Sequence, residues 1–294
     1  MEIINRRKRM MSLARKLRRE ENRTIGLVAT MGALHEGHLS LIHEARALCD
    51  VVVVSIFVNP AQFGPNEDFE SYPRDLTADA ATLAEYNVDY VFAPTVEEIY
   101  PRGFSTYVLV EGLSDALEGA SRPGHFRGVA TVVAILLNAV RPNFAFFGQK
   151  DAQQSIIIKQ MVRDLAFDTE IVVLPIVREQ SGLAMSSRNA YLDAEQRQAA
   201  TVLNRALTQA RSAYDEGEHN SGRLIDLVRS SIEAQPLARV DYVSINDAAT
   251  LKKLDKLDER PALLSLAVFF GKTRLIDNVV LGAAKKEDAA GANA

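Results

Sequence analysis

The feature that most constrains the fold is a regular alternation of short apolar runs and helical patterns through residues 1–176. Residues 25–30 and 51–58 are apolar runs of the kind found in strands that are buried on both faces. Between them, residues 39–49 carry apolar side chains three and four positions apart, which is the spacing of an amphipathic helix. Strands that alternate with helices build a parallel sheet with crossover helices, so the sequence predicts an α/β fold.

The remaining elements of this region complete the layout. A loop is expected over 59–72, where Pro60, Gly64 and Pro65 stand among polar residues. The other expected helices are 77–86, 129–139 and 155–164, and the other expected strands are 88–92, 106–110, 144–147 and 171–174. We therefore expect a Rossmann-like open parallel sheet with helices on both faces.

The pattern changes after the polar stretch 181–189. Two helical patterns there precede three strand patterns, at 194–214, 222–234, 240–245, 263–270 and 275–280. We predict a domain boundary near Arg178, with a Rossmann-like ligand-binding domain over 1–177 and a smaller α+β lid domain over 178–294. The Ala-rich end, from about residue 285, is expected to be a disordered tail.

Charge and cysteine content narrow the classes of function. The 38 acidic and 34 basic residues give a net charge of -4 and a pI near 5.8. Nucleic-acid-binding domains are usually basic, so this net charge does not favour a nucleic-acid partner. No apolar run approaches the roughly 18 to 20 residues of a membrane span. The single Cys49 gives no internal disulfide and suits the cytoplasm. The basic stretch 6–19 is interpreted as a solvated helix, with a nucleic-acid- or lipid-binding arm as the alternative.

The strongest local signal is the stretch ATMGALHEGHLSLI, which leaves the strand 25–30 and opens a helix. His35 and His38 would lie on one side of the first turn, where free N–H groups and the helix dipole favour an anion. Gly37 lets the backbone approach a phosphate without a Cβ, and Gly32 allows a tight turn. Imidazole donors at this point would stabilise the charge that grows when an α-phosphate is attacked and pyrophosphate leaves.

Two other roles for these histidines stay open. Both can be capping or core side chains. A zinc site that includes His43 is less favoured, because structural zinc uses four ligands, commonly with Cys, and His43 points to a different face of the helix.

A second constellation follows the strand 144–147. It delivers Gly148, Gln149, Lys150 and Asp151 to the carboxyl edge, where open parallel sheets bind ligands. The Lys150 ammonium suits a phosphate, and Asp151 could hold Mg²⁺ directly or through water. The alternative is that both are exposed surface charges.

The polar stretch 181–189 forms a third constellation. Ser186, Ser187 and Arg188 supply two hydroxyls and a guanidinium fork on a flexible loop, which suits clamping a polyphosphate after it binds. The alternative is a polar turn that caps the next helix.

A fourth constellation supplies uncharged groups. Asn59 and Gln62 follow the strand 51–58, and their amides can read hydroxyl and carboxylate groups, although an ordinary Asn-Pro turn is the alternative. The motif RPGHFRGV adds cationic groups that could receive a carboxylate or lie in a solvated loop: Arg122, His125 and Arg127.

Together these motifs resemble the pantothenate synthetase family of HxGH nucleotidyltransferases. TMGALHEGH, FVNPAQF, RPGHFRGV, FFGQKD with Gln154, and AMSSRN occur in that family's order and approximate spacing, over about residues 22–192. HxGH is shared with other adenylyltransferases and class I aminoacyl-tRNA synthetases, whereas FVNPxQF and RPxHFxGV are more specific. The loop reads MSSR and not the KMSKS of the tRNA synthetases, and Gln149 stands where many members are expected to carry Glu.

The resemblance implies a ligase that uses ATP and Mg²⁺ to condense (R)-pantoate with β-alanine. Pantoate would attack the α-phosphate to give pantoyl adenylate and pyrophosphate, and β-alanine would then attack the acyl carbon and release AMP. The product would be pantothenate, and the domain over 1–177 would bind the nucleotide and pantoate. The resemblance also implies a homodimer.

The resemblance also implies roles by position. The catalytic residues would be His35, His38 as the family's proton donor, Lys150, Ser186, Ser187 and Arg188. The nucleotide site would comprise Met31, Gly32, Ala33, Leu34, His35, Glu36, Gly37, His38, Gly148, Gln149, Lys150, Asp151, Val177, Met185, Ser186, Ser187 and Arg188. Gln62 and Gln154 would hold pantoate, with Asn59 and Arg122 as second-rank candidates, and Asp151 would be the metal ligand.

Two other functions are weighed against this one. Another HxGH adenylyltransferase would act on a phosphorylated acceptor and should carry extra Lys or Arg where this chain has Gln62 and Gln154. A non-catalytic nucleotide sensor should have lost a phosphate-facing residue, whereas His35, His38, Lys150 and Arg188 are all present.

Overall fold

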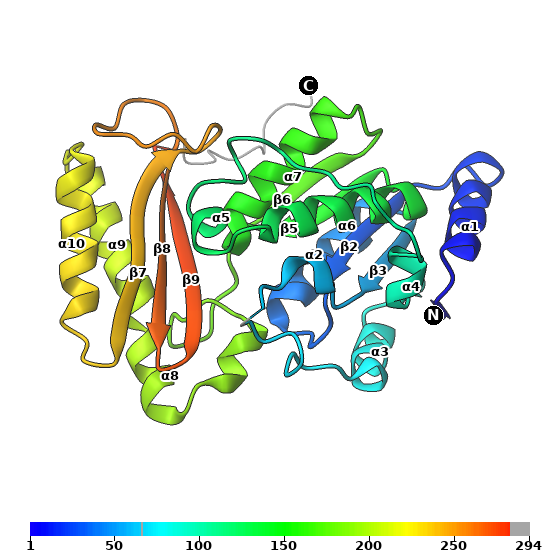
Figure 1. Cartoon of the computed structure of the whole chain (residues 1–294), viewed down its shortest axis with the longest axis horizontal. Coiled ribbons are helices and arrows are strands. Elements are labelled where there is room, and N and C mark those ends of the chain that lie inside the picture. Colours follow the sequence, from blue (N-terminus) through cyan, green and yellow to red (C-terminus); the bar gives the residue numbers. More distant parts are fainter. Residues whose placement is uncertain (66, 283–294) are drawn as a thin grey trace, which may run out of the picture. The chain divides into compact units, whose positions relative to one another are not determined.

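The computed structural model describes residues 1–65 and 67–282, so the tail predicted from about residue 285 lies outside the described residues. The chain divides into two units (Figure 1): the first is Met1–Glu179 with Ala184–Asn189, and the second is Gln180–Leu183 with the chain from Ala190 onward. The polar stretch 184–189 thus packs with the first unit, although it follows Arg178, near which the domain boundary is predicted.

The first unit contains a six-stranded sheet in the order β1-β4-β3-β2-β5-β6, and all neighbouring strands are parallel. The strands are β1 (Glu2–Ile4), β2 (Ile25–Thr30), β3 (Val51–Ile56), β4 (Tyr90–Phe92), β5 (Phe144–Gly148) and β6 (Glu170–Leu174). The chain adds β3 and β4 on one side of β2, then crosses to add β5 and β6 on the other. Open parallel sheets bind ligands at the carboxyl ends of strands where the order reverses. The motifs after β2 and β5 both reach this point, and the predicted Rossmann-like sheet is confirmed.

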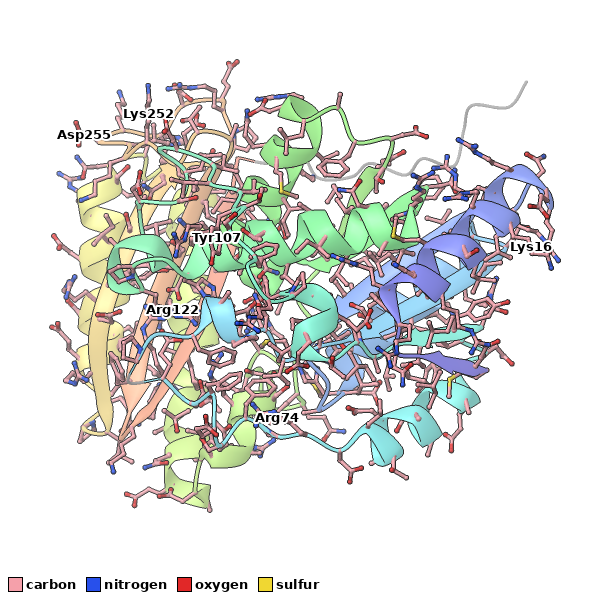
Figure 2. All side chains as sticks on the ribbon, turned by 45° about the vertical axis from the view of Figure 1, so that its right-hand side comes forward. Lys16, Arg74, Tyr107, Arg122, Lys252 and Asp255 are labelled. Atoms are coloured by element: carbon pink, nitrogen blue, oxygen red, sulfur yellow. The ribbon has the colours of Figure 1, made fainter. Side chains whose placement is uncertain are left out.

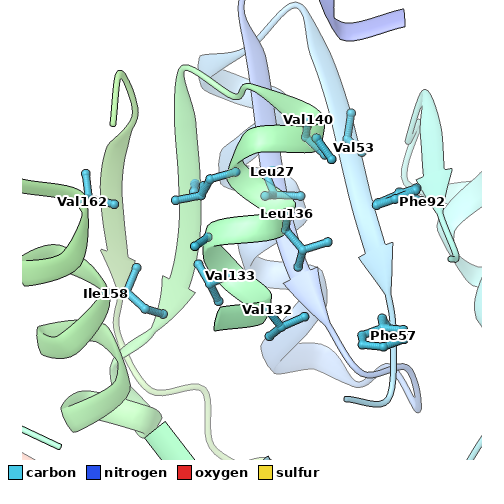
Figure 3. Close-up of a cluster of buried hydrophobic side chains, with 14 of the residues drawn as sticks. Leu27, Val53, Phe57, Phe92, Val132, Val133, Leu136, Val140, Ile158 and Val162 are labelled. Atoms are coloured by element: carbon cyan, nitrogen blue, oxygen red, sulfur yellow. The ribbon is translucent and has the colours of Figure 1, made fainter. Parts of the chain in front are cut away.

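Helices cover both faces of this sheet, as predicted. One face packs against α1 (Arg7–Arg19), α6 (His125–Val140) and α7 (Ala152–Asp164), and the other packs against α2 (Glu36–Leu48) and α3 (Leu76–Glu85). Figure 3 shows α6 across the strands, with Leu136 and Val140 on the side that faces Leu27 and Val53. Each such side chain contributes about 1.5–3 kcal/mol when it is fully buried, so this packing holds the strand ends in fixed positions.

The basic N-terminal stretch forms the helix α1, but one face of the helix is packed. Met10, Ala14 and Leu17 are buried in the first core, at the three- and four-residue spacing of a helix face. The basic side chains take the other face, and Lys16 is marked in Figure 2. No helix within the described residues is long and apolar enough to cross a membrane.

The strand predicted at 106–110 is wrong, because the structure forms no strand there. The backbone N–H of Val108 instead donates to the Thr131 hydroxyl on α6, at 2.9 Å. Several short elements were not predicted: β1, α4 (Val96–Ile99), α5 (Glu118–Ser121), η1 (Pro60–Gln62), η2 (Gln149–Asp151) and η3 (Ser187–Tyr191).

The second unit is a small α+β arrangement, as predicted. An antiparallel sheet runs in the order β7-β8-β9, and its elements are α8 (Ala194–Ala200), α9 (Val202–Asp215), α10 (Ser221–Glu233), β7 (Ala238–Asp247), β8 (Ala262–Phe270) and β9 (Thr273–Leu281). Apolar residues of the helices and the sheet share one core. The helical pattern predicted over 194–214 is confirmed, but it forms two helices, because the chain ends one helix and begins the next at Thr201, whose hydroxyl donates to the Gln198 carbonyl.

Candidate active site

A cavity of about 220 Å³ lies within the first unit, where the loops after β2, β3 and β5 meet. Most of the predicted site residues line it: Met31, His35, Gly37, His38, Asn59, Gln62, Arg122, Gly148, Lys150, Asp151, Gln154, Val177, Met185, Ser186, Ser187 and Arg188. The structure therefore brings together four motifs that are distant in sequence. Five predicted nucleotide-site residues do not line the cavity: Gly32, Ala33, Leu34, Glu36 and Gln149.

His35 and His38 begin α2 and cap each other's backbone. His35 is the N-cap, and its Nδ1 accepts from the Gly37 N–H at 3.1 Å. The His38 Nδ1 accepts from the His35 N–H at 3.4 Å, and the two ring centroids are 4.1 Å apart. An acceptor nitrogen carries no proton, so in each neutral ring the proton is on Nε2. Both histidines thus present an Nε2–H donor.

The environment keeps both rings neutral. Burial, and then the charge of Lys150, lower the pKa of His35 to about 4. Burial, and then the neighbouring His35, lower the pKa of His38 to about 3. At neutral pH the two rings are therefore uncharged hydrogen-bond donors beside the Lys150 cation, and they are not imidazolium ions.

Gly37 is required by the ring of His35. A Cβ at this position would lie 2.9 Å from Cε1 and 3.0 Å from Nδ1 of His35. Those distances are shorter than ordinary van der Waals contact, so any side chain here would displace the His35 ring from its cap.

The turn before the histidines is held by Asp79, which the sequence did not single out. Its buried carboxylate accepts from the N–H groups of Ala33 and Leu34, each at 3.0 Å. A Cβ on Gly32, where φ is +85°, would lie 2.8 Å from the Asp79 carboxylate. This is why Gly32, Ala33 and Leu34 face α3 and not the cavity. In the sequence, Asp79 looks like any acidic residue near a helix start.

Lys150 and Asp151 stand at the end of β5, in η2. The Lys150 Nζ is 3.7 Å from the Asp151 carboxylate, and the Asp151 side chain is about half exposed. The Lys150 charge is close enough to lower the pKa of both histidines. The cation, the two imidazole donors and a carboxylate therefore meet at one edge of the sheet.

The loop after Val177 brings its hydroxyls to the same place. The Met185 N–H donates to the Val177 carbonyl at 3.0 Å, and the Ser187 hydroxyl donates to the Ala33 carbonyl at 3.1 Å. The Arg188 guanidinium donates to Asp68 through Nε at 3.0 Å and Nη2 at 2.9 Å. The loop is thus tied to the turn after β2 by Ser187 and to the loop after β3 by Arg188.

Asn59 uses every hydrogen-bonding position of its buried side-chain amide. Its Nδ2 donates to Gln62 Oε1 at 3.0 Å and to the Gly128 carbonyl at 3.1 Å. Its Oδ1 accepts from the Ala61 N–H at 3.2 Å and the Tyr100 hydroxyl at 2.7 Å. A primary amide has two donors and about two acceptor positions, so Asn59 has none left for a ligand. It orients Gln62.

Gln62 keeps capacity for a ligand. Its Nε2 donates to the Met31 sulfur at 3.1 Å, which is a weak acceptor, and this leaves a second N–H. Gln154, in the first turns of α7, adds a second uncharged amide to the cavity wall.

Comparisons with known proteins identify the relatives of this chain. A family model described as Pantoate-beta-alanine ligase matches residues 2–280. The pantothenate synthetase of Pelotomaculum thermopropionicum is 56% identical over 264 residues, covering 90% of this chain and 93% of that protein. That of Herpetosiphon aurantiacus is 58% identical over 257 residues, covering 87% and 93%.

Solved structures give the same result. Pantothenate synthetase from Thermus thermophilus matches with a TM-score of 0.88 and 45% identity, covering 95% of this chain and 99% of that one. Pantoate-beta-alanine ligase from Francisella tularensis, complexed with beta-gamma ATP and beta-alanine, matches with a TM-score of 0.78 and 38% identity, covering 95% and 97%.

Proposed function

This chain belongs to the pantoate–β-alanine ligase family, and from that premise we propose the role of each site residue in the reaction. The chain is an ATP-dependent ligase that condenses pantoate with β-alanine to pantothenate through pantoyl adenylate, releasing AMP and pyrophosphate. The observation that carries the assignment of roles is the mutual cap of His35 and His38 beside Lys150 at the reversal point of the sheet.

In the first step, a pantoate carboxylate oxygen forms a bond to the α-phosphorus, and the bond to the leaving pyrophosphate breaks. Negative charge grows on the phosphate oxygens. The Nε2–H groups of His35 and His38 would donate to these oxygens, and the Lys150 ammonium would neutralise part of the charge. Because the two imidazoles are already neutral, they give up no proton and need none back. His38 would therefore act as a donor that keeps its proton.

The acid substrate would lie against Gln62 and Gln154. Both amides are uncharged, so they can bind pantoate without neutralising the carboxylate that must attack. In the second step, the β-alanine amine would form a bond to the acyl carbon, lose a proton, and expel AMP. Ser186, Ser187 and Arg188 would hold the phosphates through both steps.

Asp151 is the proposed ligand for Mg²⁺. Mg²⁺ in nucleotide sites is held by one or two carboxylates together with substrate phosphates and several waters. Asp151 suits this type of coordination, because its carboxylate is about half exposed and lines the cavity, where it would face both water and phosphate. The ion would supply charge neutralisation for the leaving pyrophosphate. Asp151→Asn should raise the Mg²⁺ concentration that gives half-maximal activity.

We also propose a homodimer in a cytoplasmic enzyme, with the segment 106–110 at the interface. In this segment Val110 is buried, and Tyr107 and Leu109 are 47% and 52% exposed (Figure 2 labels Tyr107). Such alternation is that of a half-buried strand, yet within the described residues the segment belongs to no sheet. The same segment of a second copy would supply the missing strand. Leu109→Glu should give a monomer by light scattering, whereas the equally exposed Leu165→Glu should not.

The experiment that tests the function is an assay of pyrophosphate and AMP with each substrate omitted in turn. We expect pyrophosphate with ATP and pantoate alone, and stoichiometric AMP only when β-alanine is added. Release that requires a phosphorylated acceptor in place of pantoate would overturn the assignment in favour of another HxGH adenylyltransferase.

A further inference from the structure

Two arginines line the cavity, and each is held by a carboxylate from one loop. Arg122 donates to Glu67 through Nε at 2.8 Å and Nη2 at 2.6 Å. Arg188 donates to the next residue, Asp68, in the same bidentate manner. All four side chains are less than one third exposed, so these pairs are more than surface ion pairs. Two consecutive residues of a single loop thus fix the orientation of both guanidinium groups.

Almost all N–H groups of the Arg122 guanidinium form contacts within the protein. Besides the two bonds to Glu67, Nη1 contacts His125 Nε2 at 3.0 Å and Nη2 donates to the Gln62 carbonyl at 3.4 Å. Four of the five N–H groups of this guanidinium are therefore used within the protein. Arg122, labelled in Figure 2, is consequently built to hold other residues and has little capacity for a substrate carboxylate.

His125 connects Arg122 to the backbone of Gln62. Its Nδ1 lies 2.8 Å from the Gln62 carbonyl oxygen, which can only accept, so Nδ1 carries the proton. Its Nε2 then accepts from Arg122. Burial, and then the charge of Arg122, lower the pKa of His125 to about 4, which keeps the ring neutral as this arrangement requires. Each hydrogen bond between Glu67 and Gln62 therefore has a fixed donor and a fixed acceptor: Arg122 donates to Glu67 and to His125, and His125 donates to the Gln62 carbonyl.

Arg188 is held differently. Asp68 occupies Nε and one N–H of Nη2, and Nη1 bonds to no other residue in the described part of the chain. The guanidinium is thus oriented by Asp68 with one edge left for an anionic ligand. One carboxylate of the loop orients a positioning arginine, and the next orients a ligand-binding arginine.

We propose that Glu67 and Asp68 are positioning residues for opposite halves of the site: Glu67, through Arg122 and His125, sets Gln62 for the acid substrate, and Asp68 sets Arg188 for the nucleotide. The proposal rests on the proposed function, because it takes pantoate as the ligand of Gln62. Neither Glu67 nor Asp68 lines the cavity. A single loop thereby orients both substrate sites, each through its own carboxylate and arginine.

The test is the separate effect of two neighbouring substitutions on the two Michaelis constants. Glu67→Gln keeps the size and an acceptor oxygen but removes the charge, and we expect about a tenfold rise in KM for pantoate with KM for ATP unchanged. Asp68→Asn should instead raise KM for ATP about tenfold, with KM for pantoate unchanged. Glu70→Gln is the matched control, because Glu70 is an exposed acidic residue of the same loop. It should change neither constant.

A merely structural role would give a different result. If Glu67→Gln and Asp68→Asn change both constants alike, or if neither changes them, the proposal fails. Should Glu67→Gln not fold, Arg122→Lys keeps the charge without the fork and should show the same selective rise in KM for pantoate. If the wild-type protein releases no pyrophosphate with pantoate, the proposed function fails instead. Calorimetric binding of ATP to Asp68→Asn then still tests the nucleotide half.

Discussion

The histidine cap, formed by His35 and His38, and the amide pair, formed by Asn59 and Gln62, face the same cavity, but contacts of very different range hold them. In the histidine cap, His35 bonds to Gly37 two residues away and His38 bonds back to His35 three residues away. In the amide pair, Asn59 positions Gln62 through bonds to Tyr100 and Gly128, which lie 41 and 69 residues away in the sequence. The phosphate-facing half is thus a local structure, and the acid-facing half depends on the tertiary fold.

This difference predicts which kinetic parameter a substitution in each half of the site should change. A change in the histidine cap should act on the rate of the chemical step and leave the rest of the molecule intact. A change in the amide pair should act through the placement of Gln62 and should appear mainly in the affinity for the acid substrate. Kinetics of single variants can therefore separate the two halves.

The largest effect is expected from loss of a phosphate-facing donor. His38→Ala removes one Nε2–H, and we expect the rate of pyrophosphate release to fall about a hundred- to a thousandfold. His43→Ala is the matched control, because His43 is exposed on the same helix and does not line the cavity. Its rate should equal that of the wild type, and circular dichroism should show both variants folded. A near wild-type rate for His38→Ala would remove the histidine cap from the mechanism.

The next effect tests whether the cap is a local structure. Gly37→Ala would bring a Cβ to 2.9 Å from the His35 ring, so the ring must move and the rate should fall about ten- to a hundredfold. Once His35 is already Ala, the added Cβ has no ring to displace, and Gly37→Ala should then have little further effect. The double-mutant cycle measures this coupling. Independent effects in the cycle would mean that Gly37 serves the ligand and not the His35 ring.

A smaller effect is expected in the amide pair. Burial raises the pKa of Tyr100 to about 12, so its hydroxyl stays protonated and donates to Asn59. Tyr100→Phe removes this one bond, which is worth about 1 kcal/mol, and KM for pantoate should rise about fivefold while KM for ATP stays the same. Tyr107→Phe is the control, because Tyr107 does not line the cavity. A change in kcat alone would contradict the division between the two halves.

The same difference in range explains what the sequence could and could not predict. The strand end and the place of both histidines in the first turn of the next helix were predicted from the apolar runs and the HxGH spacing, with capping given as the alternative role. Asp79, Glu67 and Asp68 were missed, because their partners lie 46, 55 and 120 residues away and no local pattern distinguishes them. The segment 106–110 has the alternation of a strand, but a strand also needs a neighbour, and the edges of the parallel sheet belong to β1 and β6.

The smallest effect is one of protonation, and it distinguishes the two halves without any loss of activity. His35 and His38 accept at Nδ1 and should carry their protons on Nε2, whereas His125 donates from Nδ1 to the Gln62 carbonyl and should be the opposite tautomer. Nitrogen-15 correlation spectra of the ligand-free protein should show this pattern unchanged from pH 8 to about pH 5, since the pKa values of all three are about 3 to 4.

The unfolding free energy gives an independent check on these neutral rings. The unfolded chain takes up protons near the ordinary histidine pKa of about 6.5, whereas the folded chain does so only near pH 4. The unfolded state therefore binds more protons in this interval, and stability should fall as the pH drops from about 6.5 towards 4. His125→Gln, which keeps an amide donor for the Gln62 carbonyl, should reduce that dependence. A histidine that becomes charged at about pH 6 in the folded protein would contradict its assigned tautomer, because a doubly protonated ring has no nitrogen left to accept.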